Sequence, residues 1–332
     1  MSSLRIGPLK RLILLGGGAL LERIKRDCRD LLEVRHVGSP HQEDEWGGAA
    51  APDLVVPSRL EVGALAPFFR GVGSGEVLGL SLGARWIFRK PIIDLFQGRL
   101  LNAHGSRLPF DKGGGGFSWR IMRHDRIGNV LLHQIDEGID TGAVVHEEVY
   151  AIPRNCISPA EIEQDYVGRV AASVHRLVAR ATKDQVEYAL RRQAPSIGSY
   201  YPRLSTDDHG WINWSWGVAS ITRFVTAFDS PYPGASTFWR GQRVYVSRVQ
   251  EHCGEMAHHE GHSGIIIRTH PDFVVVAGTG GCLLVEGIRA EDGSDLLSAV
   301  REGDRLHTPS DRLDAAMSTR VSYGPSGIRS LT

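Results

Sequence analysis

The chain has 332 residues, which is enough for two domains or for one large domain with a substantial core. Apolar residues make up 42% and charged residues 23% of the sequence, the balance of a soluble globular protein. The 38 basic and 38 acidic residues cancel, so no global field would attract a polyanion. The sequence also lacks the long basic run that a nucleic-acid partner would favour.

Cysteine usage and hydropathy indicate the compartment. The four cysteines are far apart and form no Cys-x-x-Cys pair, so neither a disulfide framework nor a zinc ribbon is indicated. The apolar run 12–15 is cut short by Gly16 and does not resemble a secretory signal. No window approaches the roughly 18 apolar residues of a membrane span. We expect a protein of the reducing cytoplasm with no membrane partner, and homodimer formation is left open.

The first half of the chain alternates short apolar strands with helices. Residues 11–15 form an apolar run ending in three glycines, as a strand turning into a helix would, and 77–80 and 98–101 are expected to be further strands. Residues 91–96 are expected to form a short helix. Leu21 occupies the third glycine position of a dinucleotide-binding fingerprint, which is therefore incomplete. This alternation predicts an α/β fold, a doubly wound and mostly parallel sheet with ligands beyond the carboxyl ends of the strands.

A helical pattern over residues 158–192 is expected to close this first domain. A stretch rich in Pro, Ser, Tyr and Asp follows and is typical of a linker. We therefore predict a catalytic domain over residues 1–193, a linker over 194–210 and a smaller C-terminal domain over 211–332.

The C-terminal part favours a small barrel. Apolar residues at helical spacing from Ile221 to Phe228 precede a Pro-Tyr-Pro-Gly-Ala turn. Five strand-like runs separated by turns follow, at 236–239, 243–249, 264–268, 273–277 and 282–288. Short strands in that number predict a β-barrel-like, OB-like domain.

Two glycine-punctuated turns carry the chemistry. Asn102 and His104 follow the strand-like run 99–101, and Asp140 follows the run 129–132. An Asn amide can donate to a developing oxyanion, a His can donate or shuttle a proton, and a buried carboxylate can fix the His tautomer and favour its protonated form. Each residue alone is more often a turn or capping residue. Together they suffice for acyl transfer to an amine.

The order of these motifs matches a known family. Asn-x-His-x-Ser-x-Leu-Pro is followed by a glycine-rich stretch, Trp119 and an Asp-Thr-Gly that contains Asp140. This arrangement resembles the folate-dependent formyltransferases, which include methionyl-tRNA formyltransferase, glycinamide ribonucleotide formyltransferase and amino-sugar N-formyltransferases. The resemblance is firm over residues 81–152 and weaker over 211–288.

The resemblance implies specific roles. Asn102, His104 and Asp140 match the catalytic trio of the family, and 10-formyltetrahydrofolate is the implied formyl donor. The donor contacts it implies are Trp86, Ile87, Phe88, Asp136, Glu137, Gly138 and Ile139. No metal is implied.

The loop between the two motifs departs from the family. Relatives usually carry a short basic turn after Leu-Pro, and a Pro before the Trp, whereas this chain has four glycines at Gly113–Gly116. Because glycine allows positive φ and close backbone approach, we expect a cradle for substrate or cofactor. A flexible loop is the alternative.

The acceptor amine is less constrained. We expect the amino group of a nucleotide-linked sugar, because the C-terminal part also resembles the amino-sugar enzymes and the charge balance does not favour a large polyanion. The alternatives are an amino acid or another small amine in secondary metabolism, and methionyl-tRNA. A non-catalytic folate- or nucleotide-binding module is a further alternative, which the complete trio disfavours.

Two polar or aromatic groups of the second half are open to more than one interpretation. The tryptophans at 211, 214 and 216 are expected to pack between the domains rather than to form a stacking platform for a base or sugar. A second group contains His252, Cys253, His258, His259 and His262. It lacks the His-Glu-x-x-His spacing of a zinc helix and contains glycines, so we expect a polar surface loop without a metal.

Overall fold

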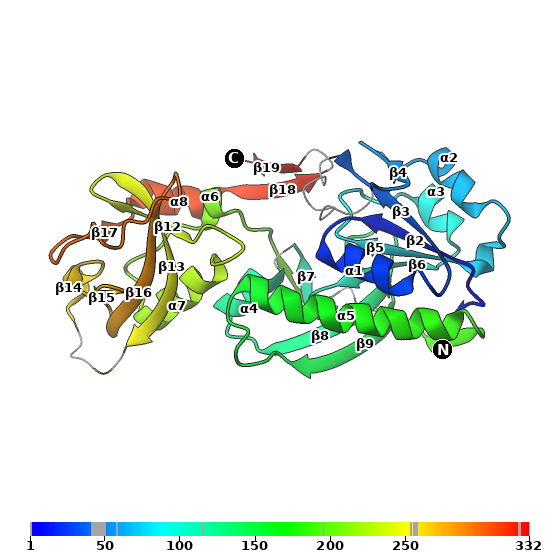
Figure 1. Cartoon of the computed structure of the whole chain (residues 1–332), viewed down its shortest axis with the longest axis horizontal. Coiled ribbons are helices and arrows are strands. Elements are labelled where there is room, and N and C mark those ends of the chain that lie inside the picture. Colours follow the sequence, from blue (N-terminus) through cyan, green and yellow to red (C-terminus); the bar gives the residue numbers. More distant parts are fainter. Residues whose placement is uncertain are drawn as a thin grey trace.

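The computed structural model describes residues 2–40, 51–57, 59–114, 116–194, 196–252, 254, 258–324 and 327–331. The larger N-terminal domain and the smaller C-terminal domain lie at opposite ends of the long axis of the molecule (Figure 1). Within the described residues, every helix is too short or too polar to cross a membrane.

The N-terminal domain is built on a seven-stranded sheet with the order β4-β3-β2-β5-β6-β8-β9. Its first five strands run parallel, and β8 and β9 are antiparallel. The strands are β2 (Arg11–Gly16), β3 (Glu33–Gly38), β4 (Leu54–Val55), β5 (Val77–Leu82), β6 (Leu100–His104), β8 (Ile127–Gln134) and β9 (Val144–Ala151). The predicted doubly wound, mostly parallel sheet is confirmed.

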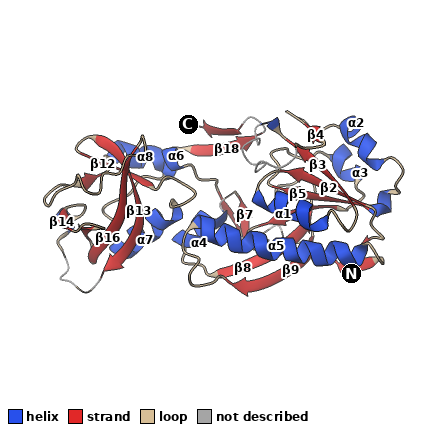
Figure 2. Cartoon of the chain, viewed as in Figure 1, coloured by secondary structure: helices blue, strands red, loops and turns tan. Residues whose placement is uncertain are grey.

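Helices cover both faces of this sheet (Figure 2). Leu12 and Leu14 of β2 pack into a core with α1 (Ala19–Cys28) and α5 (Pro159–Ala181). The alternate residues, Ile13 and Leu15, pack on the opposite face with α2 (Val62–Leu65), the 3₁₀ turn Ala66–Phe69 and α3 (Lys90–Leu95). Because successive strand side chains point to opposite faces, the uninterrupted apolar run of β2 serves both layers. A second 3₁₀ turn, Ser74–Glu76, precedes β5.

The long helix α5 is shorter than expected. It begins at a capping box, in which Ser158 accepts from the backbone of Glu161 and the Glu161 carboxylate accepts from the Ser158 backbone. The predicted continuation to residue 192 is wrong, because β10 (Val186–Ala189) pairs antiparallel with β1 (Ser3–Ile6). Val186, Tyr188 and Leu190 alternate onto the core, which is the period of a strand.

The C-terminal domain is a curled antiparallel sheet with the order β14-β15-β16-β13-β12-β17. Backbone bonds from Ile266 N to Asp304 O and from Leu306 N to Gly264 O, both 2.8 Å, join its two ends. The predicted barrel-like domain is confirmed. Its strands are β12 (Ala235–Trp239), β13 (Gln242–His252), β14 (Ile266–Thr269), β15 (Val274–Gly278), β16 (Gly281–Ala290) and β17 (Leu306–His307). The remaining elements of this part are α7 (Val218–Ala227), the 3₁₀ turn Glu260–His262, α8 (Ser310–Ser318), β18 (Arg320–Gly324) and β19 (Gly327–Leu331).

The predicted linker 194–210 contains two short elements, β11 (Ser199–Tyr201) and α6 (Thr206–His209). β11 pairs in parallel with β7 (Asp111–Gly113), so the linker runs along the N-terminal domain. The exact domain boundaries stay predictions.

The domains also meet through α4 (Gly116–Met122), which packs on α7. The Ser118 hydroxyl donates to the Ala227 carbonyl at 2.8 Å. The expectation that the tryptophans pack between domains is wrong for two of them. Trp211 stacks on Phe238, and Trp214 donates to Thr237 inside the C-terminal domain.

Candidate active site

Strands β6 and β8 bring an amide and an imidazole together. Asn102 and His133 are directly opposite in the antiparallel register, so their side chains lie on one face of the sheet. Asn102 Nδ2 lies 3.2 Å from His133 Nε2. His104 is two residues beyond Asn102 on the same strand, and its ring meets the His133 ring edge-on, with centroids 5.9 Å apart.

The loop after β8 delivers the carboxylate. Gln134 N donates to Ala143 O at 2.8 Å and closes the loop. Asp140 has a φ of 56°, a left-handed conformation that Asp tolerates better than most residues. A side chain at Gly142 would place its Cβ 1.9 Å from Gln134 O, which explains the glycine after Asp140-Thr141.

A second carboxylate, that of Asp136, stabilises the same loop through hydrogen bonds to other residues of the loop. Asp136 Oδ1 accepts from Gly138 N at 3.1 Å and from the Thr141 hydroxyl at 2.6 Å. This is the local bonding of an Asx turn. Asp136 therefore has a structural role in addition to its place beside the candidate donor site.

The amide, imidazole and carboxylate expected from the sequence converge. Asp140 Oδ1 lies 3.7 Å from His104 Nδ1 and 3.9 Å from His133 Nε2. Asp140 Oδ2 accepts from Gly113 N at 3.2 Å. His104 Nε2 is buried and has no hydrogen-bond partner among the described residues. That nitrogen can make one further hydrogen bond, and the catalytic roles of the three residues stay a prediction.

His133 was not among the predicted site residues. Burial and the neighbouring His104 lower its pKa to about 4, against the opposing effects of Asp140 and of the Gln134 carbonyl. The ring is therefore uncharged at neutral pH. In the sequence, His133 is marked only as a polar residue after the apolar run 130–132. Sequence alone does not distinguish a functional histidine there from a buried histidine whose hydrogen bonds are purely structural.

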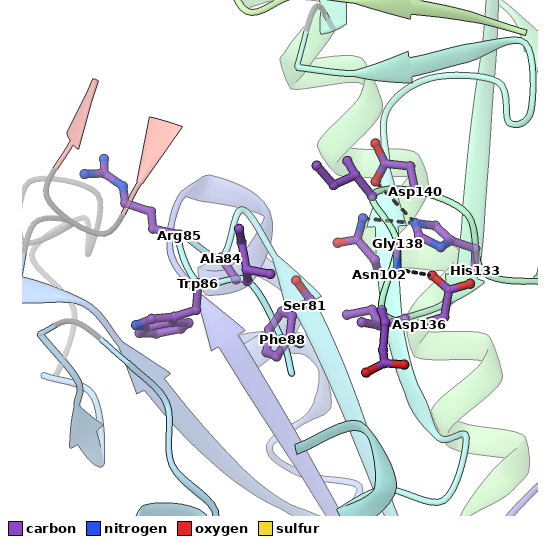
Figure 3. A pocket seen from close by; sticks show the side chains of 14 residues that line it. Ser81, Ala84, Arg85, Trp86, Phe88, Asn102, His133, Asp136, Gly138 and Asp140 are labelled. Carbon is purple, nitrogen blue, oxygen red and sulfur yellow. Dashed lines mark hydrogen bonds and ion pairs between the residues drawn. The ribbon is translucent and has the colours of Figure 1, made fainter. Parts of the chain in front are cut away.

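A cavity of about 300 Å³ adjoins these groups (Figure 3). Ser81, Trp86 and Phe88 form one wall, and Asn102, Asp136 and Asp140 lie on the other. The full lining is Ser81, Ala84, Arg85, Trp86, Ile87, Phe88, Asn102, His133, Ile135, Asp136, Glu137, Gly138, Ile139 and Asp140. All seven predicted donor contacts line the cavity, whereas His104 does not.

The apolar side chains of this lining differ in exposure. Trp86 and Phe88 are 6% and 9% exposed, whereas Ile87 and Ile139 are 79% and 65% exposed. Large apolar side chains exposed on both sides of one cavity are typical of a ligand-binding rim.

The glycine-rich loop reaches the candidate site through its first residue. Gly113 belongs to β7, has a φ of 95° and donates its N–H to Asp140. A Cβ there would lie 2.5 Å from Tyr201 O. Gly116 begins α4, and Gly115 lies outside the described residues. Gly113 thus helps to hold the carboxylate, and the predicted cradle for a ligand stays a prediction.

Two groups bear on metal binding. His104, His133 and Asp140 bring potential ligand atoms within 4.8 Å of one another, the only such group within the described residues. In the C-terminal loop, His258 Nε2 lies 3.3 Å from Cys282 Sγ, a contact that the sequence did not predict. Cys253 of the predicted histidine-rich cluster lies outside the described residues. The expectation that no metal is needed stays a prediction.

Comparisons with known proteins agree with this architecture. Residues 204–299 match the model of the formyl transferase C-terminal domain. A methionyl-tRNA formyltransferase of Cereibacter sphaeroides is 27% identical over 78% of this chain and 83% of its own length.

Two solved structures share the fold. An N-formyltransferase of Helicobacter canadensis, solved with folinic acid and dTDP-3-aminofucose, matches with a TM-score of 0.59 and 16% identity over 84% of this chain and 99% of its own. HypX of Aquifex aeolicus matches with a TM-score of 0.60 and 18% identity over 86% of this chain. The matched part spans only 47% of HypX.

The chain thus joins a mostly parallel α/β domain to a curled antiparallel domain, an architecture that it shares with the solved N-formyltransferase. The resemblance to the folate-dependent formyltransferases is confirmed by the domain match and by the relatives. They support the transfer of a one-carbon formyl group as the activity of this chain.

Proposed function

We propose that this chain transfers the formyl group of 10-formyltetrahydrofolate to an amine through Asn102, His104 and Asp140. The observation that carries the proposal is the meeting of these groups beside a cavity, together with the buried, unpartnered Nε2 of His104. Isolated buried donors or acceptors cost free energy, so such a nitrogen fits a site where a substrate completes the hydrogen bond.

The cavity has the size and the chemistry of a small-molecule site. Its volume of about 300 Å³ lies within the range of ligand pockets, and it combines aromatic and aliphatic walls with a few polar groups. Trp86 and Phe88 offer apolar contact, and the loop from Asp136 to Asp140 offers backbone polar groups to a heterocycle. The Helicobacter canadensis relative was solved with folinic acid, a formylated folate, which supports a folate in this cavity.

The chain's own groups account for the chemistry. An unprotonated amine forms a bond to the formyl carbon, and negative charge develops on the formyl oxygen. Asn102 Nδ2 and a protonated His104 donate to that oxygen, and each such donor is worth about 3 kcal/mol of barrier. Asp140 orients the His104 ring from 3.7 Å. The bond from carbon to the folate nitrogen then breaks, and the proton lost by the amine replaces the formyl group there.

We further propose a nucleotide-linked amino sugar as the acceptor. Residues 211–332 contain 11 arginines, no lysine and 13 acidic residues, so the C-terminal domain has no excess of positive charge for a polynucleotide. The structural relative solved with dTDP-3-aminofucose supports a sugar nucleotide. Methionyl-tRNA is the second candidate, favoured by the name of the Cereibacter relative. Another small amine of secondary metabolism is the third.

A cytoplasmic location belongs to the same proposal. The buried thiols of Cys28, Cys156 and Cys282 form no disulfide within the part of the chain that the structure describes, which fits a reducing compartment.

Mass spectrometry of the acceptor distinguishes these candidates. The protein is incubated with 10-formyltetrahydrofolate and, separately, with dTDP-linked amino sugars, free amino acids and methionyl-tRNA. We expect the mass gain of one formyl group on an amino sugar. It should be absent when the donor is omitted and should form about 100- to 1,000-fold more slowly with the Asn102→Ala variant. Efficient formylation of methionyl-tRNA alone would overturn the sugar proposal. Folate binding without transfer to any amine would overturn formyl transfer itself and indicate a binding module.

A further inference from the structure

His133 is a buried imidazole to which the mechanism above gives no role. It is 2% exposed and lies directly opposite Asn102 in the pairing of β6 with β8. Its two ring nitrogens have different partners. Nε2 lies 3.2 Å from Asn102 Nδ2 (Figure 3). Nδ1 lies 2.8 Å from the Gln134 carbonyl oxygen.

These partners fix the proton positions. A carbonyl oxygen only accepts, so His133 Nδ1 carries the proton and donates to Gln134 O. Burial and His104 hold the ring in its neutral form by lowering its pKa to about 4. In a neutral ring with Nδ1 protonated, Nε2 has a free lone pair and can only accept.

That lone pair determines the orientation of the Asn102 amide. With Nδ2 facing His133, the amide donates to Nε2, whereas a reversed amide would place Oδ1 against the lone pair, acceptor against acceptor. An amide nitrogen carries two protons. One is used by His133, and the other is left for the cavity that Asn102 lines.

The orientation decides whether Asn102 can serve the reaction. A proton directed into the cavity stabilises negative charge on the formyl oxygen, whereas the amide oxygen in its place would repel that charge. Asp140 does not take over this role in the structure, because its Oδ2 accepts from Gly113 N and its Oδ1 faces the two imidazoles, at 3.7 Å from His104 Nδ1 and 3.9 Å from His133 Nε2.

We propose that His133 is a positioning residue that fixes the Asn102 amide with an N–H, rather than its oxygen, facing the reacting formyl group. This role rests on the proposed function, because it acts on the formyl-transfer step through Asn102. His133 need not touch the substrate.

A double-mutant cycle tests this role. Asn102→Ala should lower kcat by about 100- to 1,000-fold, the usual cost of a lost oxyanion donor. His133→Leu should lower kcat by about 10-fold or more, because the amide is then free to reverse. The double variant should resemble Asn102→Ala alone, since residues that act through one contact are not additive. His133→Gln, whose carbonyl oxygen can accept from Asn102, should recover most of the loss.

Each outcome decides a different point. An equal loss from His133→Leu in the wild-type and Asn102→Ala backgrounds would overturn the role, as would an unchanged kcat. A loss confined to the KM of the folate would also overturn it, because the proposed effect is on the transition state. No transfer by the wild type to any acceptor would overturn the proposed function and this role with it.

A spectroscopic measurement does not depend on the folding of the variants. In the ¹⁵N NMR spectrum of the wild-type protein near neutral pH, His133 should show a protonated Nδ1 and an unprotonated Nε2. A proton on Nε2 would overturn the proposal whatever the kinetics.

Discussion

Acidification should destabilise the N-terminal domain through His133. The pKa of this ring is lowered from 6.5 to about 4 by its burial and by the neighbouring His104. The unfolded chain therefore takes up a proton as the pH falls through about 6.5, while the folded chain resists it until about 4. The contribution of His133 to stability is full above that window, falls across it and is constant below it.

The size of this effect follows from the shift. One pKa unit corresponds to about 1.4 kcal/mol, so protonation of the unfolded state alone should cost about 3 kcal/mol by pH 4. That is a large part of the stability of an ordinary domain, which is about 5–15 kcal/mol. Other titrating groups change over the same range, so the effect has to be measured as a difference between matched proteins.

His133→Gln is the matched variant, because it removes the titration and keeps an acceptor beside Asn102. Urea unfolding of the N-terminal domain is followed for both proteins at about pH 7 and about pH 4. The stability of the wild type relative to the variant should fall by about 3 kcal/mol between these conditions. A constant difference, or an NMR titration of His133 with its midpoint near about 6.5, would refute the reasoning from burial and hydrogen bonding.

Three further outcomes are expected. Asp140→Asn keeps the shape of the loop but removes the charge of the carboxylate. In steady-state kinetics it should lower kcat by about 100-fold or more with little change in the KM of the folate. Near-normal turnover would exclude Asp140 from the mechanism. Gln193→Ala removes the N–H groups that donate to the Asp140 and Gly142 carbonyls, at 2.9 and 2.7 Å. This variant should lower kcat about tenfold, because the left-handed turn at Asp140 is then less rigid. An unchanged kcat would show that the turn keeps its shape without this side chain. Dialysis against EDTA should leave formyl transfer unchanged, whereas added Zn²⁺ should inhibit it by engaging His104 and Asp140; loss of activity after chelation, restored by a metal, would contradict the expectation that no metal is needed.

Much of the fold could be predicted because its elements carry local signals. The apolar runs that form β2 and β5 are buried on both faces, and their unbroken hydrophobicity is itself the sign of a covered parallel strand. The strands of the C-terminal domain were recognisable for a similar reason, since each is bounded by turn residues.

The errors arose where contacts distant in sequence decided the structure. β10 falls at the end of the predicted helical pattern 158–192, and only its pairing with β1 makes it a strand. The partners of Trp211 and Trp214 likewise depend on a non-local contact. Trp211 bridges to Ser236 of β12, and this brings Phe238 and Thr237 of the same strand to the two tryptophans. Spacing along the chain does not indicate either partner.

The candidate site divides in the same way. Asn102, His104 and Asp140 stood out because each lies in a recognisable motif after an apolar strand. His133 lies in no motif, and its importance comes from the register that places it opposite Asn102. The contact of Gly113 with Asp140 is equally non-local, since one backbone N–H joins β7 to the loop after β8.

The most direct test of the central claim is a comparison of formyl transfer by the wild type and by His104→Ala under single-turnover conditions, with the formylated amine detected by mass spectrometry. The account predicts transfer by the wild type and a rate lower by orders of magnitude in the folded variant, whose buried imidazole nitrogen is missing. A variant that transfers the formyl group at a near-normal rate would contradict it.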